Sequence, residues 1–105
     1  GGQRGRRMAK VYERAEIEER LRSYPGWALG EDGQLHRELT FNNFAQAMLY
    51  ASAVGHLAES ADHHPDLFIH GYKHLRISLM THSEKGITDR DFALIEQIEA
   101  LPRRA

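Results

Sequence analysis

The chain has 105 residues, which is enough for one compact domain and too few for two. Its 14 basic and 15 acidic residues nearly cancel, so charge gives no argument for nucleic-acid binding. The absence of cysteine excludes disulfides, thiolate catalysis and zinc held by thiolates. No apolar run approaches the roughly 20 residues that a membrane-spanning helix needs. Residues 1–10 are basic without a following apolar segment, and are predicted to be a disordered tail or a cloning remnant.

The first predicted elements are a helix and a β-hairpin. Residues 11–24 are predicted to be helical, because their few apolar residues fall on one narrow stripe. Pro25-Gly26 ends this helix, since proline lacks an amide hydrogen and restricts the residue before it. Two strands, residues 27–29 and 35–41, are expected on either side of a turn at residues 31–34.

A long helix follows, which Asn42 or Asn43 can cap and which should run to about residues 60–61. Seven residues recur at helical spacing and are predicted to form its core face: Phe44, Ala47, Met48, Ala51, Val54, Gly55 and Ala58. Pro65 disfavours helical geometry at His64, so the helix is expected to end at a pair of histidines. A rigid, well-anchored element would then hold both imidazoles, as catalysis requires.

The last third of the chain predicts two strands and a helix. Residues 66–71 are a loop or the beginning of a strand, and a clear alternation follows. One face of that second strand carries Leu75, Ile77, Leu79 and Thr81. His82 belongs to the other, less apolar face, at the end of the strand. Thr88 and Asp91 have the spacing of a capping box, and Arg90 is interpreted as part of a charge pair at this helix start.

The order helix, two strands, helix, two strands, helix predicts the α+β class. We expect a single four-stranded antiparallel sheet with three helices packed on one face, formed by one domain over residues 11–102. The other face of the sheet must then be solvated or covered by a partner chain.

Three of the seven histidines, His63, His64 and His82, lie at the ends of predicted elements, where side chains can converge. Unperturbed histidine has a pKa of about 6.5, so several together can offer a proton donor and a proton acceptor at one pH. A metal site is the alternative, because two histidines and the neighbouring Asp62 would suit zinc or iron. Adjacent residues point in different directions, which makes this alternative the weaker one. The other histidines are expected to be ordinary surface or core residues.

These motifs resemble the pterin-4a-carbinolamine dehydratase family. The resemblance rests on the residues Glu59-Ser60-Ala61-Asp62-His63-His64-Pro65, Tyr72, Thr81-His82, Gly86-Ile87-Thr88 and Asp91. Gly26-Trp27 and Leu39-Thr40-Phe41-Asn42-Asn43-Phe44 look like the upstream signature of the same family. The similarity covers roughly residues 13–101, and the combination of His-His-Pro with Thr-His is its specific part.

The resemblance implies a cytoplasmic lyase that dehydrates 4a-hydroxytetrahydropterin to quinonoid dihydropterin in tetrahydrobiopterin recycling. Such a reaction needs an acid at the leaving hydroxyl and a base at N5, and neither a metal nor a redox cofactor. The implied partners are the pterin and further copies of the chain, as a homodimer or homotetramer, without nucleic acid or membrane. A branch of the family serves in assembly, so a non-catalytic oligomeric binding or assembly module is the alternative, against which the three histidines argue.

The resemblance also implies roles for individual residues. His63 and His82 are the candidates for protonating the hydroxyl and handling the N5 proton, with the acid and the base left open. His64 would hold or polarise the pterin, or share in proton transfer. Three carboxylates would orient the imidazoles or bind the amino-pyrimidine edge of the pterin: Glu59, Asp62 and Asp91.

Other residues are expected around the substrate. Pro65 and the backbone at Met80 and Thr81 would line the slot. Leu67 departs from the aromatic residue that many members of the family carry two positions after the proline. Three aromatic residues elsewhere could cover the pterin ring instead: Trp27, Phe68 and Tyr72.

Overall fold

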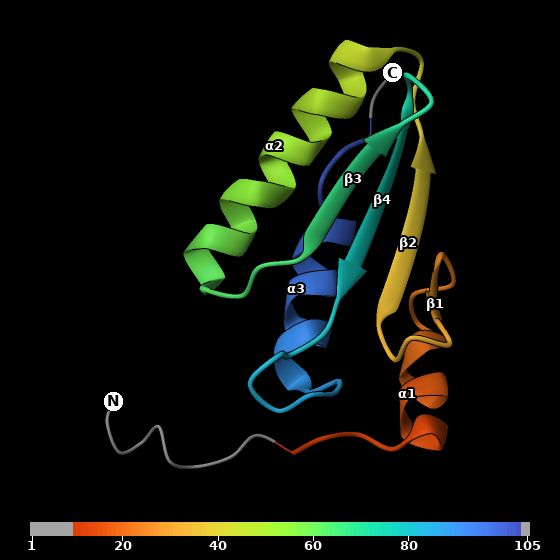
Figure 1. The fold of residues 1–105 in the computed structure, drawn as a ribbon, viewed down its shortest axis with the longest axis vertical. Coiled ribbons are helices and arrows are strands. Elements are labelled where there is room, and N and C mark those ends of the chain that lie inside the picture. The colour runs from red at the N-terminus through yellow and green to blue at the C-terminus, as the bar shows by residue number, and fades with distance from the viewer. Residues whose placement is uncertain (1–9, 104–105) are drawn as a thin grey trace.

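The computed structural model describes residues 10–103, which contain three helices and four strands (Figure 1). In chain order these are α1 (Arg14–Leu21), β1 (Trp27–Leu29), β2 (Leu35–Thr40), α2 (Phe44–Ala61), β3 (Asp66–His70), β4 (His74–Leu79) and α3 (Asp89–Glu99). The predicted α+β class and element order are confirmed. The tail expected over residues 1–10 lies outside the described residues except for Lys10, and the extent of the single domain stays a prediction.

The four strands form one antiparallel sheet in the order β1-β2-β4-β3. Figure 1 shows α2 and α3 lying over the same face of this sheet, while α1 packs beside β1. Alternation along β4 turns Leu75, Ile77 and Leu79 toward the helices, as predicted, and all three are completely buried. Replacing such a side chain by alanine typically costs about 2–5 kcal/mol of folding free energy.

The face of α2 that meets the sheet differs in part from the predicted stripe. The buried residues of α2 are Ala47, Tyr50, Ala51, Val54 and Ala58. Phe44 and Met48 were expected in the core but are 48% and 42% exposed. The helix is apolar on more than one side, so its periodicity alone could not define which side the sheet covers. Phe44 instead stacks on exposed Tyr72, with ring centroids 6.4 Å apart.

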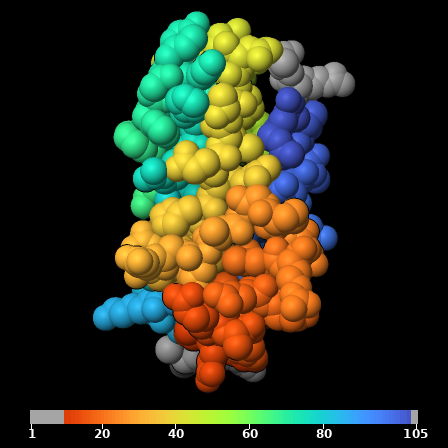
Figure 2. All heavy atoms as spheres, turned by 90° about the vertical axis from the view of Figure 1, so that its right-hand side faces the viewer, coloured from red at the N-terminus to blue at the C-terminus, as the bar shows by residue number. Residues whose placement is uncertain are grey.

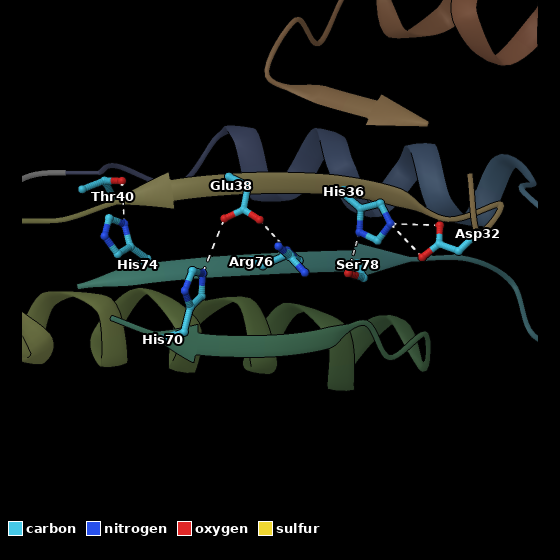
Figure 3. A network of polar contacts seen from close by, with 8 residues as sticks. All are labelled: Asp32, His36, Glu38, Thr40, His70, His74, Arg76 and Ser78. Atoms are coloured by element: carbon cyan, nitrogen blue, oxygen red, sulfur yellow. Dashed lines mark hydrogen bonds and ion pairs between the residues drawn. The ribbon is translucent and has the colours of Figure 1, made fainter. Parts of the chain in front are cut away.

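The sheet face opposite the helices carries a network of polar side chains from neighbouring strands (Figure 3). His36 contacts Ser78 at 2.7 Å and Asp32 at 3.0 Å, and Thr40 contacts His74 at 3.0 Å. Between these pairs, Arg76 donates to Glu38, whose other oxygen lies 3.6 Å from His70. Of the two covers expected for this face, solvent or a partner, the polar composition suits solvent.

Different helices and strands lie at the two ends of the molecule. Figure 1 shows the end of α2, the end of β4 and the start of α3 gathered at one end. Figure 2, viewed from the right of Figure 1, shows α1 and β1 (red to orange) at that end and the β3–β4 hairpin (blue-green) at the other. Among residues 10–103, no helix combines the length and the apolar character needed to cross a membrane.

Candidate active site

The histidine pair follows directly on the end of α2. Asp62 caps this helix in the left-handed conformation, with φ 52° and ψ 45°, and the amide of His63 donates to the Ala58 carbonyl at 3.1 Å. Aspartate is one of the few residues besides glycine that adopt this conformation regularly. The chain reverses here, and the two histidine side chains lie in different surroundings. The side chain of His63 is 7% exposed, whereas that of His64 is 57% exposed.

His63 is held by a carboxylate from the start of α3. Its Nε2 lies 2.7 Å from Oδ1 of Asp91, and the Asp91 side chain is completely buried. Asp91 is the third residue of α3, and its side chain also receives the Thr88 amide in the predicted capping box. The capping geometry therefore fixes the carboxylate that the imidazole meets.

The second oxygen of Asp91 accepts two further hydrogen bonds. Oδ2 accepts from the Thr81 hydroxyl at 2.7 Å and from the Thr88 amide at 2.9 Å. Because Thr81 uses its only hydroxyl hydrogen there, the 2.7 Å contact between the two threonine hydroxyls must be donated by Thr88. Thr81 lies just beyond β4, so this network joins the ends of α2 and β4 to the start of α3.

The network determines which nitrogen of His63 is free. An ionised carboxylate can only accept hydrogen bonds, so Nε2 of His63 must carry a hydrogen toward Asp91. In the neutral imidazole the free lone pair then lies on Nδ1. A buried aspartate that fixes one tautomer leaves the opposite ring nitrogen able to accept a proton.

His64 forms a second, exposed pair. Its Nε2 lies 2.8 Å from Oε1 of Glu59, a residue in the last turn of α2. The two histidines therefore contact different carboxylates, one inside the molecule and one on its surface. Among residues 10–103, no three histidine or acidic side chains are grouped so that they could hold a metal ion.

The remaining predicted site residues lie around these two pairs. His82 is exposed and follows Thr81 directly, which brings it within one residue of the Asp91 network. Met80 is partly buried against the core, and Pro65 is half-buried between His64 and β3. Asp62 is exposed at the helix cap.

The three aromatic residues considered for covering a pterin do not converge on the histidines. Trp27 is buried and donates its indole N–H to Glu99 at 2.9 Å. Phe68 stacks on His70 on the outer face of the sheet. Tyr72 lies in the β3–β4 hairpin beside Phe44, the first residue of α2, whereas His63 lies just beyond the other end of this helix. The 18 residues of α2 span about 27 Å.

Two members of this region were not identified from the sequence as part of the site. Thr88 was expected only as a helix cap, but its hydroxyl also bonds to Thr81. Arg90 was expected to pair with charges at the start of its own helix, yet its Nη2 donates to the Asp62 carbonyl at 2.6 Å. The capping-box spacing could have drawn attention to Thr88, whereas no local pattern signals a contact between Arg90 and another helix.

Known proteins share both the sequence and the fold of this chain. A family model described as pterin 4 alpha carbinolamine dehydratase matches residues 10–101. The chain belongs to this family.

Two bacterial relatives of the family illustrate the similarity. A protein of Acidobacterium capsulatum, provisionally named a pterin-4-alpha-carbinolamine dehydratase, is 44% identical over 94 residues, which cover 90% of this chain and 99% of the relative. A protein of Cupriavidus pinatubonensis with the same provisional name is 43% identical over 90 residues, covering 85% and 77%.

Solved structures extend the comparison of the family to three dimensions. The crystal structure of a transcriptional coactivator/pterin dehydratase from Brucella melitensis has a TM-score of 0.80 and 29% identity, covering 87% of this chain and 97% of that one. A pterin dehydratase-like protein identified as a RuBisCO assembly factor has a TM-score of 0.58 and 21% identity, covering 71% and 87%. This second likeness shows a shared fold alone.

Proposed function

We propose that this chain removes water from 4a-hydroxytetrahydropterin to give quinonoid dihydropterin. The observation that carries the proposal is the buried pair of His63 and Asp91 beside the exposed pair of His64 and Glu59. Membership of the family supports dehydratase activity, and the matched relatives bear that name.

The reaction balances with one proton donated and one removed. The lone pair on N5 forms the C4a=N5 double bond while the C4a–O bond breaks. An acid gives a proton to the departing hydroxyl, which leaves as water, and a base takes the proton from N5. No electron leaves the pterin, so the residues need only move protons and hold the ring. Positioned acids and bases each contribute about 10²–10⁴-fold to a rate.

His63 is proposed as the base, acting through Nδ1. The hydrogen bond from Nε2 to Asp91 supports this role, because it leaves the lone pair of the neutral ring on Nδ1. Asp91 is proposed to position His63 without touching the pterin, since both of its oxygens already accept hydrogen bonds and the residue is completely buried.

The acid is proposed to be His82 or His64, both of which are exposed. In its protonated form, His64 could donate from Nδ1 while Nε2 stays bonded to Glu59. The Asp62 carboxylate is proposed to bind the amino-pyrimidine edge of the pterin. The slot beside it would be lined by Pro65 and by the backbone at Met80 and Thr81.

The deciding experiment follows the ultraviolet absorbance of freshly generated 4a-hydroxytetrahydropterin. The wild-type chain should accelerate its dehydration, and His63→Ala and His82→Ala should each lower the rate while far-ultraviolet circular dichroism stays unchanged. A metal chelator should leave the wild-type rate as it is. Equal rates with the protein and with buffer would refute the enzyme assignment, and unchanged turnover in both variants would refute the histidine mechanism.

A non-catalytic oligomeric module is the second candidate, favoured by the exposed apolar residues of α2. Phe44, Met48 and Leu49 are 48%, 42% and 70% exposed, and such surfaces commonly mark protein interfaces. A stoichiometric protein partner that binds the histidine variants normally, together with absent pterin turnover, would favour this candidate. Homodimer or homotetramer formation through the same surface is compatible with either function and is proposed for both.

The cellular role is proposed from family membership alone. The quinonoid product is an oxidised pterin, so the reaction would precede its reduction in tetrahydrobiopterin recycling, and we place it in the cytoplasm. Loss of the gene should then make a pterin-dependent hydroxylation in the same cell slower. Normal hydroxylation and normal pterin levels in such cells would contradict this role.

A further inference from the structure

Arg90, in the first turn of α3, reaches back to the end of α2. Its Nη2 donates to the Asp62 carbonyl at 2.6 Å, although the two residues are 28 positions apart. Asp91, which follows Arg90 in α3, binds the ring of His63, which follows Asp62. Two consecutive residues of α3 therefore hold two consecutive residues of the turn that carries the histidines.

The charge of Arg90 suits the end of α2 better than the start of its own helix. A cation is disfavoured near a helix N-terminus and favoured near a C-terminus, where carbonyl groups lack partners. The last turn of α2 contains no basic residue, so Arg90 brings to it the cation that α2 itself lacks. The dipole of α3 therefore does not explain an arginine at this position, whereas the contact with α2 does.

The carbonyl that Arg90 binds belongs to the peptide group that leads into His63. At the other side of the same peptide, the His63 amide donates to the Ala58 carbonyl at 3.1 Å. This peptide follows Asp62, whose backbone is left-handed with φ 52°. The bonds from Arg90 and to Ala58 hold the two sides of this peptide group, so the turn is fixed by a contact from α3 as well as by the end of α2.

We propose that Arg90 is a positioning residue, which fixes the peptide between Asp62 and His63 so that the imidazole of His63 is held from both its backbone and its ring. The proposal rests on the proposed dehydratase function, because its consequence is a correctly placed Nδ1. Small displacements of a reacting group can lower turnover by about 10²-fold. Arg90 is exposed, so its replacement should leave the fold intact.

The test compares Arg90→Met and Arg90→Lys with a control, Arg14→Met, on an exposed arginine that pairs with Glu18 on α1. Amide hydrogen exchange of His63 measures the turn, and kcat and KM for 4a-hydroxytetrahydropterin measure its consequence. In Arg90→Met we expect roughly tenfold faster exchange and a roughly tenfold lower kcat, with KM changed less than about twofold. Arg90→Lys, which keeps a charged donor, should lie between this variant and the wild type, and Arg14→Met should match the wild type.

Each other result has a defined meaning. Faster exchange with unchanged kcat would overturn the positioning role, and lower kcat with unchanged exchange would overturn the proposed route through the turn. Unchanged exchange and kcat would overturn the whole inference. If the wild-type chain does not dehydrate the pterin at all, the proposed function fails, while hydrogen exchange still decides whether Arg90 holds the turn.

Discussion

His63 and Asp91, 28 residues apart in the chain, are joined by a 2.7 Å hydrogen bond that is almost completely shielded from water. Their side chains are 7% and 0% exposed. In such surroundings a polar group that loses its partner cannot exchange it for water, so the bond fixes the ring more firmly than a surface contact would.

Asp91→Asn should lower both activity and stability. Asparagine keeps the shape of the side chain, but its amide group would face a donor where Asp91 now accepts hydrogen bonds on both oxygens. We expect kcat to fall by about 10²-fold and the free energy of unfolding to fall by about 1–3 kcal/mol. Asp89→Asn, two residues earlier and exposed, is the control for charge at the start of α3. Near-normal turnover in Asp91→Asn would show that the tautomer of His63 does not matter.

Thr81→Val should show how much the threonine hydrogen bonds around Asp91 contribute to stability when the bond between Asp91 and His63 is kept. The substitution removes the hydroxyl that donates to Asp91 at 2.7 Å and accepts from Thr88, but leaves the His63 bond in place. Urea unfolding should show a loss of about 1–2 kcal/mol, with a smaller loss of turnover than in Asp91→Asn. Thr40→Val, which removes an exposed hydroxyl bonded to His74, is the matched control and should lower stability by less than Thr81→Val and leave turnover unchanged.

His64 and His82 should be distinguishable by chemical rescue. If His82 is the acid, His82→Ala should regain part of its kcat when imidazole is added, whereas a residue that only binds the pterin should show mainly a raised KM. The matched experiment is His64→Ala under the same conditions. Rescue of neither variant by imidazole would contradict the proposed choice between these two acids.

The sheet face shown in Figure 3 should contribute a stability that disappears in acid. The guanidinium of Arg76, which donates to Glu38, holds the pKa of this carboxyl below its ordinary value of 4.5. A lowered folded-state pKa stabilises the protein above pH 4.5, and this contribution is lost as the pH falls through the lower folded value. Glu38→Gln should therefore be less stable than the wild type by about 0.5 kcal/mol at pH 7. The difference should vanish once the pH has fallen below the lowered folded-state pKa of Glu38, and a constant difference would contradict the pairing.

Leu49→Lys should weaken self-association. Leu49 is 70% exposed on α2, so a charge there would oppose burial of this helix against a second copy. Light scattering coupled to size exclusion should show a smaller assembly for this variant and an unchanged one for Gln97→Lys on α3. A monomeric wild type would contradict the expected homo-oligomer.

The sequence predicted the fold well because most elements have a local signal, although residues 66–71, which contain β3, were expected as a loop or the beginning of a strand. The turn at residues 31–34, the caps at Asn43 and Thr88 and the alternation along β4 all depend on neighbours in the chain, and each appears in the structure. These signals also predicted that the histidine pair would follow the end of a long helix.

Contacts between distant segments could not be predicted in the same way. The spacing of Thr88 and Asp91 identified a cap, but gave no indication that the same carboxylate also meets His63. The side on which α2 would be covered was also undetermined, because Phe44 and Met48 lie beside the buried alanines on an apolar helix. Tyr72 and Trp27 are part of the family pattern, yet their distance from the histidines depends on the register of strands, which residue types alone do not define.

The directions of the hydrogen bonds around Asp91 also determine how protons can travel. Thr81 and the Thr88 amide donate to one oxygen of this carboxylate, and His63 donates to the other. Among residues 10–103, the hydrogen bonds that continue from Asp91 lead to Thr81 and Thr88, and the Thr88 hydroxyl accepts from the Arg90 amide. The network therefore gives the ring no route for moving a proton through the interior to solvent. In the proposed mechanism, a proton that His63 takes up at Nδ1 would leave from the same nitrogen to bulk solvent. Each catalytic cycle would then end with the buried network in the state in which it began.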